Sequence, residues 1–381
     1  MAEGPQRNAC FASAVASDEP PEALAASLVA QLAPLPEGAN FGFLYATQAL
    51  APALDEIVET LRRATGIASW TGSLGYGVAG CAVEVHDRPA LSALVGRFPE
   101  DSLRPFGPLA PETPRLHGGE ISWATEHPPV FGVAHGDPRL PALPEILEDL
   151  ALATSTYFVG GLAAVAEGSP LPEAAGDGFL KAGLAGVLFD PQVQVATGLT
   201  QGCTPIGPKR QITAAERNVV VEIDGRPALE VFKEDIGELL ARNLNRVSGY
   251  IHVGFPIFGS DTGDYLVRNL VGIDTERGLL GVGAPVQPGD TLMFCRRDHA
   301  AATKDLDRML HEVMKRAGGP PKAALYYSCV ARGQHLFGNN SEELRQVRDG
   351  IGEVPLTGFF ANGEICNDRL YGYTGVLTLI L

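Results

Sequence analysis

The stretch that decides the fold is Ala323-Ala-Leu-Tyr-Tyr-Ser-Cys-Val-Ala-Arg332, followed later by Gly358-Phe-Phe-Ala-Asn-Gly-Glu-Ile-Cys366. The first is an apolar, strand-like run that ends with a thiol, Cys329, and a guanidinium, Arg332. The second places a carboxylate, Glu364, in a glycine-rich turn after another strand-like run. Ligands of such sheets bind outside the carboxyl ends of parallel strands. We therefore expect these three side chains to share a small-molecule pocket.

The same succession of strand, helix and strand occurs in three places along the chain. The strands are expected at 41–47 and 67–71, 130–134 and 157–161, and 324–329 and 354–357, with helices at about 54–64 and 144–153 and from 340. Thr71-Gly72 and Thr357-Gly358 each end a strand, and a second glycine follows five positions later. The glycine stretches 72–77 and 358–363 are predicted to be turns. The match indicates an internal duplication, unless unrelated units of this type simply look alike.

The alternation of strand and helix patterns predicts an α/β protein of two related halves, with strand–helix–strand units, mixed sheets and helices packed on them. The middle of the chain has a different texture. Asp224-Gly225 between apolar runs indicates a hairpin, and residues 298–314 have apolar residues at helical spacing. We place the domain boundary near Thr213, which divides residues 1–213 from residues 214–381.

Composition excludes several classes of partner. The 381 residues carry a net charge of −16 and have a pI near 4.9, which argues against nucleic-acid and membrane partners. The six cysteines form no Cys-x-x-Cys pair, so a structural zinc site is not expected. Residues 1–19 lack the pattern of a signal peptide, and the expected location is the cytoplasm.

The chain resembles the FIST family, the "F-box and intracellular signal transduction" sensory domains. The resemblance rests on a series of stretches in sequence order: 70–80, 136–138, 160–162, 201–208, 218–228, 295–298, 328–333 and 358–364. It implies an N-terminal FIST-like domain at 1–213 and a C-terminal one at 214–381, which together bind a small ligand. The resemblance also implies that this ligand is an amino acid or a similar polar metabolite, and that a signalling protein supplies the output.

A cation and an anion in one cavity suit a zwitterion, so we expect Arg332 and Glu364 to hold the two charged ends of the ligand. The alternative is that they form a structural pair. Cys329 beside Arg332 is expected to have a lowered pKa, although cysteines are often core residues. The ligand-binding prediction comprises Arg332, Glu364, Cys329, Phe359, Asn362, Gly358, Ser73, Tyr76 and Cys203.

Two other functions are open at this point. The first is a cysteine-dependent enzyme that acts on a small carboxylic or amino acid, with Cys329 as nucleophile or base. The second is a haem-based gas sensor, in which His335 would bind the iron. We assign no catalytic residue, metal ligand or resident cofactor. Glu342-Glu343 is interpreted as a pair of acids that offsets the dipole at a helix start.

Overall fold

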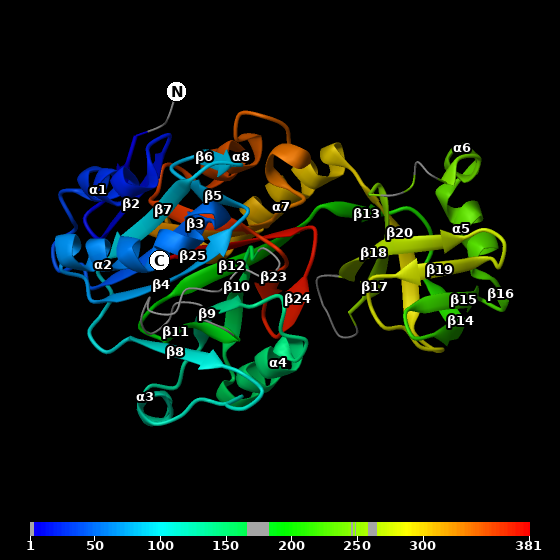
Figure 1. Cartoon of the computed structure of the whole chain (residues 1–381), viewed down its shortest axis with the longest axis horizontal. Helices are drawn as coiled ribbons and strands as arrows, with labels where there is room; N and C mark the ends of the chain where they lie inside the picture. Colours follow the sequence, from blue (N-terminus) through cyan, green and yellow to red (C-terminus); the bar gives the residue numbers. More distant parts are fainter. Residues whose placement is uncertain (1–3, 166–182, 245–246, 248, 258–264) are drawn as a thin grey trace. The chain divides into compact units, whose positions relative to one another are not determined.

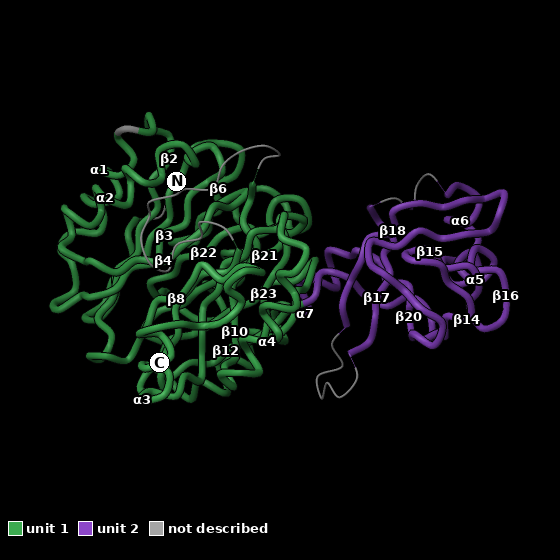
Figure 2. Tube along the Cα trace, turned by 60° about the horizontal axis from the view of Figure 1, so that its bottom comes forward, with its two compact units in different colours: residues 1–200, 306–381 green, residues 201–305 purple. Residues whose placement is uncertain are grey.

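The computed structural model describes residues 4–165, 183–244, 247, 249–257 and 265–381, and it divides the chain into two compact units. Unit 1 comprises residues 1–200 and 306–381, and unit 2 comprises residues 201–305 (Figure 2). The predicted α/β class with mixed sheets is confirmed. The two units are defined by contacts in space, whereas the domain boundary near Thr213 was inferred from the sequence. That boundary stays a prediction. No helix within the described ranges has the length and apolar character needed to cross a membrane.

The strands among the described residues of unit 1 form three sheets, each named here after its central strand. The β3 sheet has the order β1 (Gln6–Arg7), β2 (Phe11–Ser17), β7 (Ala90–Gly96), β3 (Phe41–Thr47) and β4 (Ser69–Gly75). The β9 sheet has the order β24 (Arg369–Tyr371), β23 (Glu364–Cys366), β10 (Tyr157–Leu162), β9 (Phe131–Gly136), β11 (Leu184–Phe189) and β8 (Leu103–Leu109). The β21 sheet has the order β12 (Val195–Gln201), β25 (Thr374–Ile380), β21 (Ala323–Cys329), β22 (Leu356–Ala361), β5 (Gly77–Gly80) and β6 (Val83–His86).

Helices cover these sheets (Figure 1). They are α1 (Pro21–Leu32), η1 (Gln48–Ala53), α2 (Leu54–Thr65), α3 (Gly119–Glu126), α4 (Leu143–Thr154), α7 (His299–Ala317), η3 (Gly333–His335) and α8 (Glu342–Ile351). In α2 the buried residues are Leu54, Ile57, Val58 and Leu61, a spacing that places them on one helix face. This face packs on the β3 sheet in a core that includes Leu44. The predicted helices at 54–64 and 144–153 are confirmed by α2 and α4.

The three sheets are copies of one arrangement. In each, the central strand pairs in parallel with the strand after it (β4, β10, β22) and antiparallel with the last strand of its repeat (β7, β11, β25). The parallel registers can be aligned on the fifth residue of each central strand. In the three sheets, this residue pairs with Ser73 of β4, Gly161 of β10 and Phe359 of β22, respectively. Unit 1 is therefore built of three related repeats, at residues 11–96, 103–189 and 195–380. Unit 2 is inserted in the third.

A closed cycle of backbone hydrogen bonds joins the repeats. The bonds run from Tyr76 N–H to Phe360 O (3.0 Å), from Asn362 N–H to Leu162 O (3.1 Å) and from Ala164 N–H to Leu74 O (2.9 Å). Beyond this cycle, the β5–β6 hairpin of the first repeat extends the β21 sheet, and the β23–β24 hairpin of the third extends the β9 sheet. Each bond joins positions that are equivalent by register, so the three repeats are related by a pseudo-threefold axis.

The glycine stretches 72–77 and 358–363 were predicted to be turns, and this was wrong for all but Tyr76 and residues 362–363. β4 continues to Gly75 and β22 continues to Ala361. Only Tyr76 separates β4 from β5, and at this point the chain passes from the β3 sheet to the β21 sheet. The glycines serve close packing within the strands. A Cβ on Gly358 would lie 1.7 Å from the carbonyl oxygen of Tyr326.

Unit 2 is an antiparallel sheet with helices α5 (Ala228–Ile236) and α6 (Glu238–Ala241). Its strands are β13 (Cys203–Pro205), β14 (Arg210–Glu216), β15 (Val219–Ile223), β16 (Arg226–Pro227), β17 (Ile251–Pro256), β18 (Tyr265–Asp274), β19 (Leu279–Val282) and β20 (Thr291–Arg297). β20 pairs with both β14 and β17, which closes the sheet into a ring around a core that includes Phe232 and Phe294. The Asp224-Gly225 hairpin is confirmed, since both residues have positive φ and join β15 to β16.

Candidate functional site

The predicted neighbourhood of the two decisive segments is confirmed. β21 and β22 are adjacent and parallel, and Cys329 pairs in register with Ala361. Arg332 follows the end of β21 by three residues, and Glu364 begins β23 three residues after the end of β22. The thiol, the guanidinium and the carboxylate therefore meet at the carboxyl ends of these two strands.

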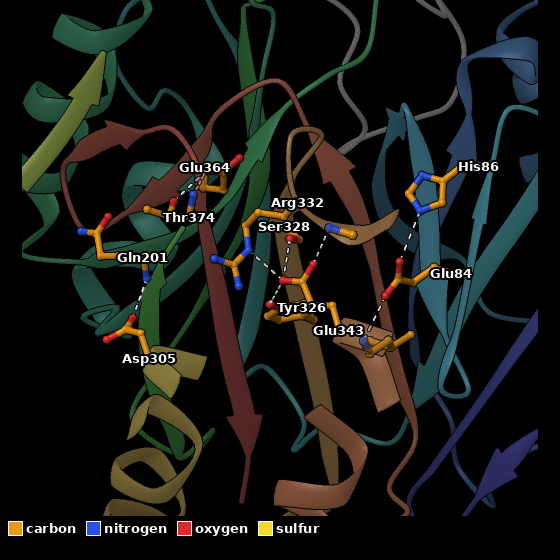
Figure 3. Close-up of polar contacts among 12 residues, drawn as sticks. Glu84, His86, Gln201, Asp305, Tyr326, Ser328, Arg332, Glu343, Glu364 and Thr374 are labelled. Atoms are coloured by element: carbon orange, nitrogen blue, oxygen red, sulfur yellow. Dashed lines mark hydrogen bonds and ion pairs between the residues drawn. The ribbon is translucent and has the colours of Figure 1, made fainter. Parts of the chain in front are cut away.

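Arg332 is fully buried and forms an ion pair with Glu343 of α8, whose Oε1 accepts its Nε–H at 2.8 Å (Figure 3). The hydroxyl groups of Tyr326 and Ser328 donate hydrogen bonds to the same oxygen at 2.6 and 3.0 Å, and the Gly333 N–H donates to Oε2 at 2.7 Å. Burial alone would lower the pKa of Arg332, but the Glu343 carboxylate outweighs it and raises that pKa. Glu343 was interpreted from the sequence only as an acid that offsets the helix dipole. In the structure it also fixes the orientation of Arg332.

The outer nitrogens of Arg332 are unused. Nη1 and Nη2 are both buried, and neither has a hydrogen-bond partner among the described residues. The guanidinium carbon lies 4.9 Å from the centre of the Phe337 ring, which supports one face of the group. The guanidinium of Arg332 therefore packs one face on Phe337 and is fixed at its Nε by Glu343, which leaves its two outer nitrogens as a pair of parallel donors. Such a pair of donors is suited to a planar anionic group.

Glu364 is also fully buried, and only one of its oxygens is satisfied. Oε2 accepts the backbone N–H of Thr374 at 3.1 Å and its hydroxyl at 2.7 Å, whereas Oε1 has no partner among the described residues. Burial raises the pKa of Glu364 to about 8, against the bonds from Thr374, which favour the charged form. At neutral pH the carboxyl group is therefore mostly protonated.

The expectation that Arg332 lowers the pKa of Cys329 was wrong. Burial raises the pKa of this thiol, and the nearby Glu364 carboxylate raises it further, while the effect of Arg332 is smaller. The residue is only 7% exposed. Cys329 is consequently a neutral thiol at physiological pH, which weighs against a role as a nucleophile.

The first repeat provides an internal comparison for this polar set. By strand register, Tyr326, Ser328, Glu364 and Thr374 of the third repeat are equivalent to Leu44, Ala46, Val78 and Ala90 of the first. All four residues of the first repeat are buried. The same architecture therefore forms with apolar side chains at these places. The first repeat lacks these buried polar groups, so this arrangement of strands does not require them.

The other predicted site residues lie in different settings. Phe359 is a core residue that stacks on Tyr45, with ring centres 4.9 Å apart. Ser73 is buried in β4, while Tyr76 is 36% exposed. Asn362 has an exposed side chain and takes part in the backbone cycle. Cys203 is buried at the start of β13 in unit 2. A ligand-binding role for each of these residues stays a prediction.

Sequence reasoning missed a second polar cluster, which lies where the three sheets meet. The fifth residues of the three central strands are Tyr45, His135 and Tyr327, and all are fully buried. The Tyr45 hydroxyl lies 2.8 Å from that of Tyr327 and 3.2 Å from Nε2 of His135. Burial lowers the pKa of His135 to about 3, so the ring is neutral. The equal spacing of these residues within their strands was a signal that could have identified them.

His335, the residue considered for haem, lies in η3 with an exposed side chain. It is three residues beyond Arg332, on the loop that carries the guanidinium. Haem binding stays a prediction, which an absorption spectrum of the purified protein would test.

Comparison with known families agrees with this architecture and site. Two family models match the chain, a FIST N domain over residues 40–226 and a FIST C domain over residues 228–367. The chain belongs to the FIST family, whose domains are sensory domains of signal-transduction proteins. The resemblance inferred from the sequence is thereby confirmed. The border between the two family domains falls within unit 2.

Curated relatives come from mycobacteria. The chain is 35% identical over 216 residues to an uncharacterized protein of Mycobacterium tuberculosis, a match that covers 53% of this chain and 55% of the relative. It is 31% identical over 210 residues to an uncharacterized protein of Mycobacterium bovis, covering 53% of this chain and 54% of the relative. The chain spans about half the length of the curated relatives it matches.

Proposed function

We propose that this chain is a sensory protein that binds a small metabolite with a carboxylate and an amine, such as an amino acid, at Arg332 and Glu364. One observation carries the proposal. Arg332 Nη1, Arg332 Nη2 and Glu364 Oε1 are buried and have no hydrogen-bond partner among the described residues. A buried polar group left unpaired costs about 1–3 kcal/mol, which is a reason to expect that something else pairs with these atoms.

The chemistry of the two groups is complementary to that ligand. The two outer nitrogens of one guanidinium can donate two parallel hydrogen bonds to a carboxylate, and Glu343 holds the guanidinium from its Nε side. Glu364 Oε1 would accept a hydrogen bond from the ligand's ammonium group. Because burial raises the pKa of Glu364 to about 8, a cation beside it would lower that pKa. Binding of an amine-bearing ligand near neutral pH should therefore release a proton.

The comparison between repeats supports the same conclusion. Buried charges are costly and are retained when they pair or serve a function. Because the first repeat has Val78 and Ala90 where the third has Glu364 and Thr374, stability of the repeat does not explain the polar pair.

A thermal-shift screen over α-amino acids and 2-oxo acids tests the proposal. A ligand at 100 times its dissociation constant should stabilise the protein by about 2.7 kcal/mol. Arg332→Lys keeps a cation beside Glu343 but removes the nitrogen fork, so it should abolish the shift for both classes of ligand. Arg308→Lys, at an exposed arginine paired with Glu312, is the matched control.

Glu364→Gln separates the two ends of the ligand. This variant should lose the shift for amino acids and keep it for 2-oxo acids, because only the former carry an ammonium group. Calorimetry in buffers of different ionisation enthalpy should detect proton release in the parent protein and none in Glu364→Gln. If no acid raises the melting temperature, or if Arg332→Lys leaves the shift intact, the proposal is wrong.

A further inference from the structure

A groove runs across unit 1 beside α4, and its site is separate from Arg332 and Glu364. It consists of three hollows of about 650, 400 and 420 Å³. The first and second hollows share Leu152 and Ser155, and the second and third share Val130 and Tyr157. The three hollows are therefore adjacent to one another, and together they are called the α4 groove here.

Large apolar side chains are exposed along the α4 groove. Ile121 is 51% exposed, Val130 46%, Leu152 79% and Tyr157 37%. Leu152 lies outside the buried stripe of α4, which comprises Leu143, Ile146, Leu147, Leu150 and Ala151. The packing of the helix therefore does not account for a leucine at this position. Apolar side chains gathered in an exposed groove with polar residues at its edge are typical of a protein-interaction surface.

The charges of the α4 groove select among possible occupants. Its lining includes three acids, Glu148, Asp149 and Asp368, against one cation, Arg115, although Asp368 already forms an ion pair with Arg369 at 3.6 Å. The whole chain carries a net charge of −16. A second copy of this chain or an anionic membrane would bring like charge to an acidic edge. The complementary occupant is apolar and basic.

We propose that the α4 groove docks an amphipathic helix of a partner protein, one with apolar anchor residues flanked by lysine or arginine. The apolar face of the partner helix would fill the hollows around Leu152 and Tyr157, and its basic residues would pair with Glu148 and Asp149. Binding of an amphipathic helix in an apolar groove is a common mode of peptide recognition. The proposal does not depend on the small-ligand function.

The groove and the candidate ligand site nevertheless share one structural element. The β23–β24 hairpin begins with Glu364, and the turn between its strands supplies Asn367 and Asp368 to the groove. Cys366 of the same hairpin lies 3.1 Å from the hydroxyl of Tyr157, measured from Sγ. A partner in the groove would therefore contact the hairpin that carries Glu364.

The probe for a test is a synthetic fourteen-residue helical peptide of leucine and lysine with a fluorescent label. Titration of the full chain by fluorescence anisotropy should show binding that weakens with added salt. Leu152→Ser should weaken binding by about tenfold, as for an anchor residue at the centre of an interface. Leu239→Ser, at a leucine of α6 that is 84% exposed, is the matched control and should bind like the parent protein.

The outcomes that overturn the proposal are distinct. Equal affinity of the parent protein and Leu152→Ser, with both folded by circular dichroism, would place the peptide elsewhere. Equal binding of a leucine–glutamate peptide would show that the acidic residues of the groove do not select a basic partner. Self-association in sedimentation that Leu152→Ser relieves would assign the groove to a second copy. Hydrogen exchange in the peptide complex should show protection at residues 148–157, and protection spread over other acidic surfaces would also contradict the proposal.

Discussion

The hydroxyl groups of Tyr45 and Tyr327 lie 2.8 Å apart although 282 positions separate the two residues in the sequence. Each tyrosine is the fifth residue of the central strand of its sheet, and His135 is the fifth residue of the central strand β9 in the remaining sheet. The contact therefore follows from the repeat relationship. It also concentrates three buried polar groups at the point where the repeats meet, which makes the stability of unit 1 sensitive to their hydrogen bonds.

Removal of the Tyr45 hydroxyl should cost more stability than removal of the Tyr327 hydroxyl. Tyr45→Phe leaves both Tyr327 and Nε2 of His135 without their partner, whereas Tyr327→Phe leaves the bond between Tyr45 and His135. We expect losses of about 2–3 kcal/mol and about 1 kcal/mol, respectively, in urea unfolding. Equal losses for the two variants would show that the bond to His135 contributes little.

The stability of the protein should depend on pH through Glu364. Its pKa is about 8 in the folded protein against a usual value of 4.5, because the carboxyl group is buried. Between these values the folded state binds more protons than the unfolded state, so stability falls as pH rises through this window. The slope from one such group is at most about 1.4 kcal/mol per pH unit.

Glu364→Gln removes this term and keeps an acceptor oxygen for Thr374. In urea unfolding at pH 5.5, 7.0 and 8.5, the stability of the variant relative to the parent protein should increase with pH. A difference that stays constant over this range would mean that Glu364 has the same pKa in both states.

Unit 2 should be removable without loss of the unit 1 fold. The first and last residues of unit 2 are held together, because Gln201 donates its backbone N–H to Asp305 at 2.7 Å (Figure 3). Replacement of residues 203–297 by a short Gly/Ser linker keeps this bond and the N-terminal turn of α7, which Asp298 caps through the N–H of Ala301. The shortened chain should unfold cooperatively in circular dichroism. A molten, noncooperative product would show that unit 1 needs the insert.

Substitution of Gly358 should disrupt the β21 sheet. A Cβ there would lie 1.7 Å from the carbonyl oxygen of Tyr326, and the equivalent Gly160 would place one 1.9 Å from that of Ala134. We expect Gly358→Ala to unfold the protein or to cost several kcal/mol. Gly319→Ala is the control, since open space surrounds that position. Similar melting temperatures for the two variants would contradict the steric explanation.

Much of this architecture was predictable from periodicity and glycine spacing. The parallel pairing of β21 and β22 followed from the strand–helix–strand pattern, and the match between Gly72 and Gly358 identified equivalent positions. The glycine stretches were misinterpreted as turns because glycine was taken as a signal for a change of direction. In this protein, glycine within a strand lets the backbone of the neighbouring strand come close, as Tyr326 does at Gly358.

The candidate site was predicted in part. Arg332, Cys329 and Glu364 were identified because each follows the end of a strand or lies close to one. Glu343 was assigned to the helix dipole, since local sequence does not reveal that a side chain from α8 reaches the sheet. The sign of the Cys329 pKa shift was missed for a related reason. Sequence shows the adjacent arginine but not the burial, which has the larger effect.

The exchange of hairpins between repeats has a consequence for how the protein is made. The β5–β6 hairpin is synthesised well before β22, the strand that pairs with β5, which follows about 270 residues later. Until then the inner edge of this hairpin has no strand to pair with, and exposed edges of this kind promote aggregation. Unit 1 should consequently acquire its protease resistance only after translation has passed β22, and nascent chains that stall before that point should be substrates for chaperones.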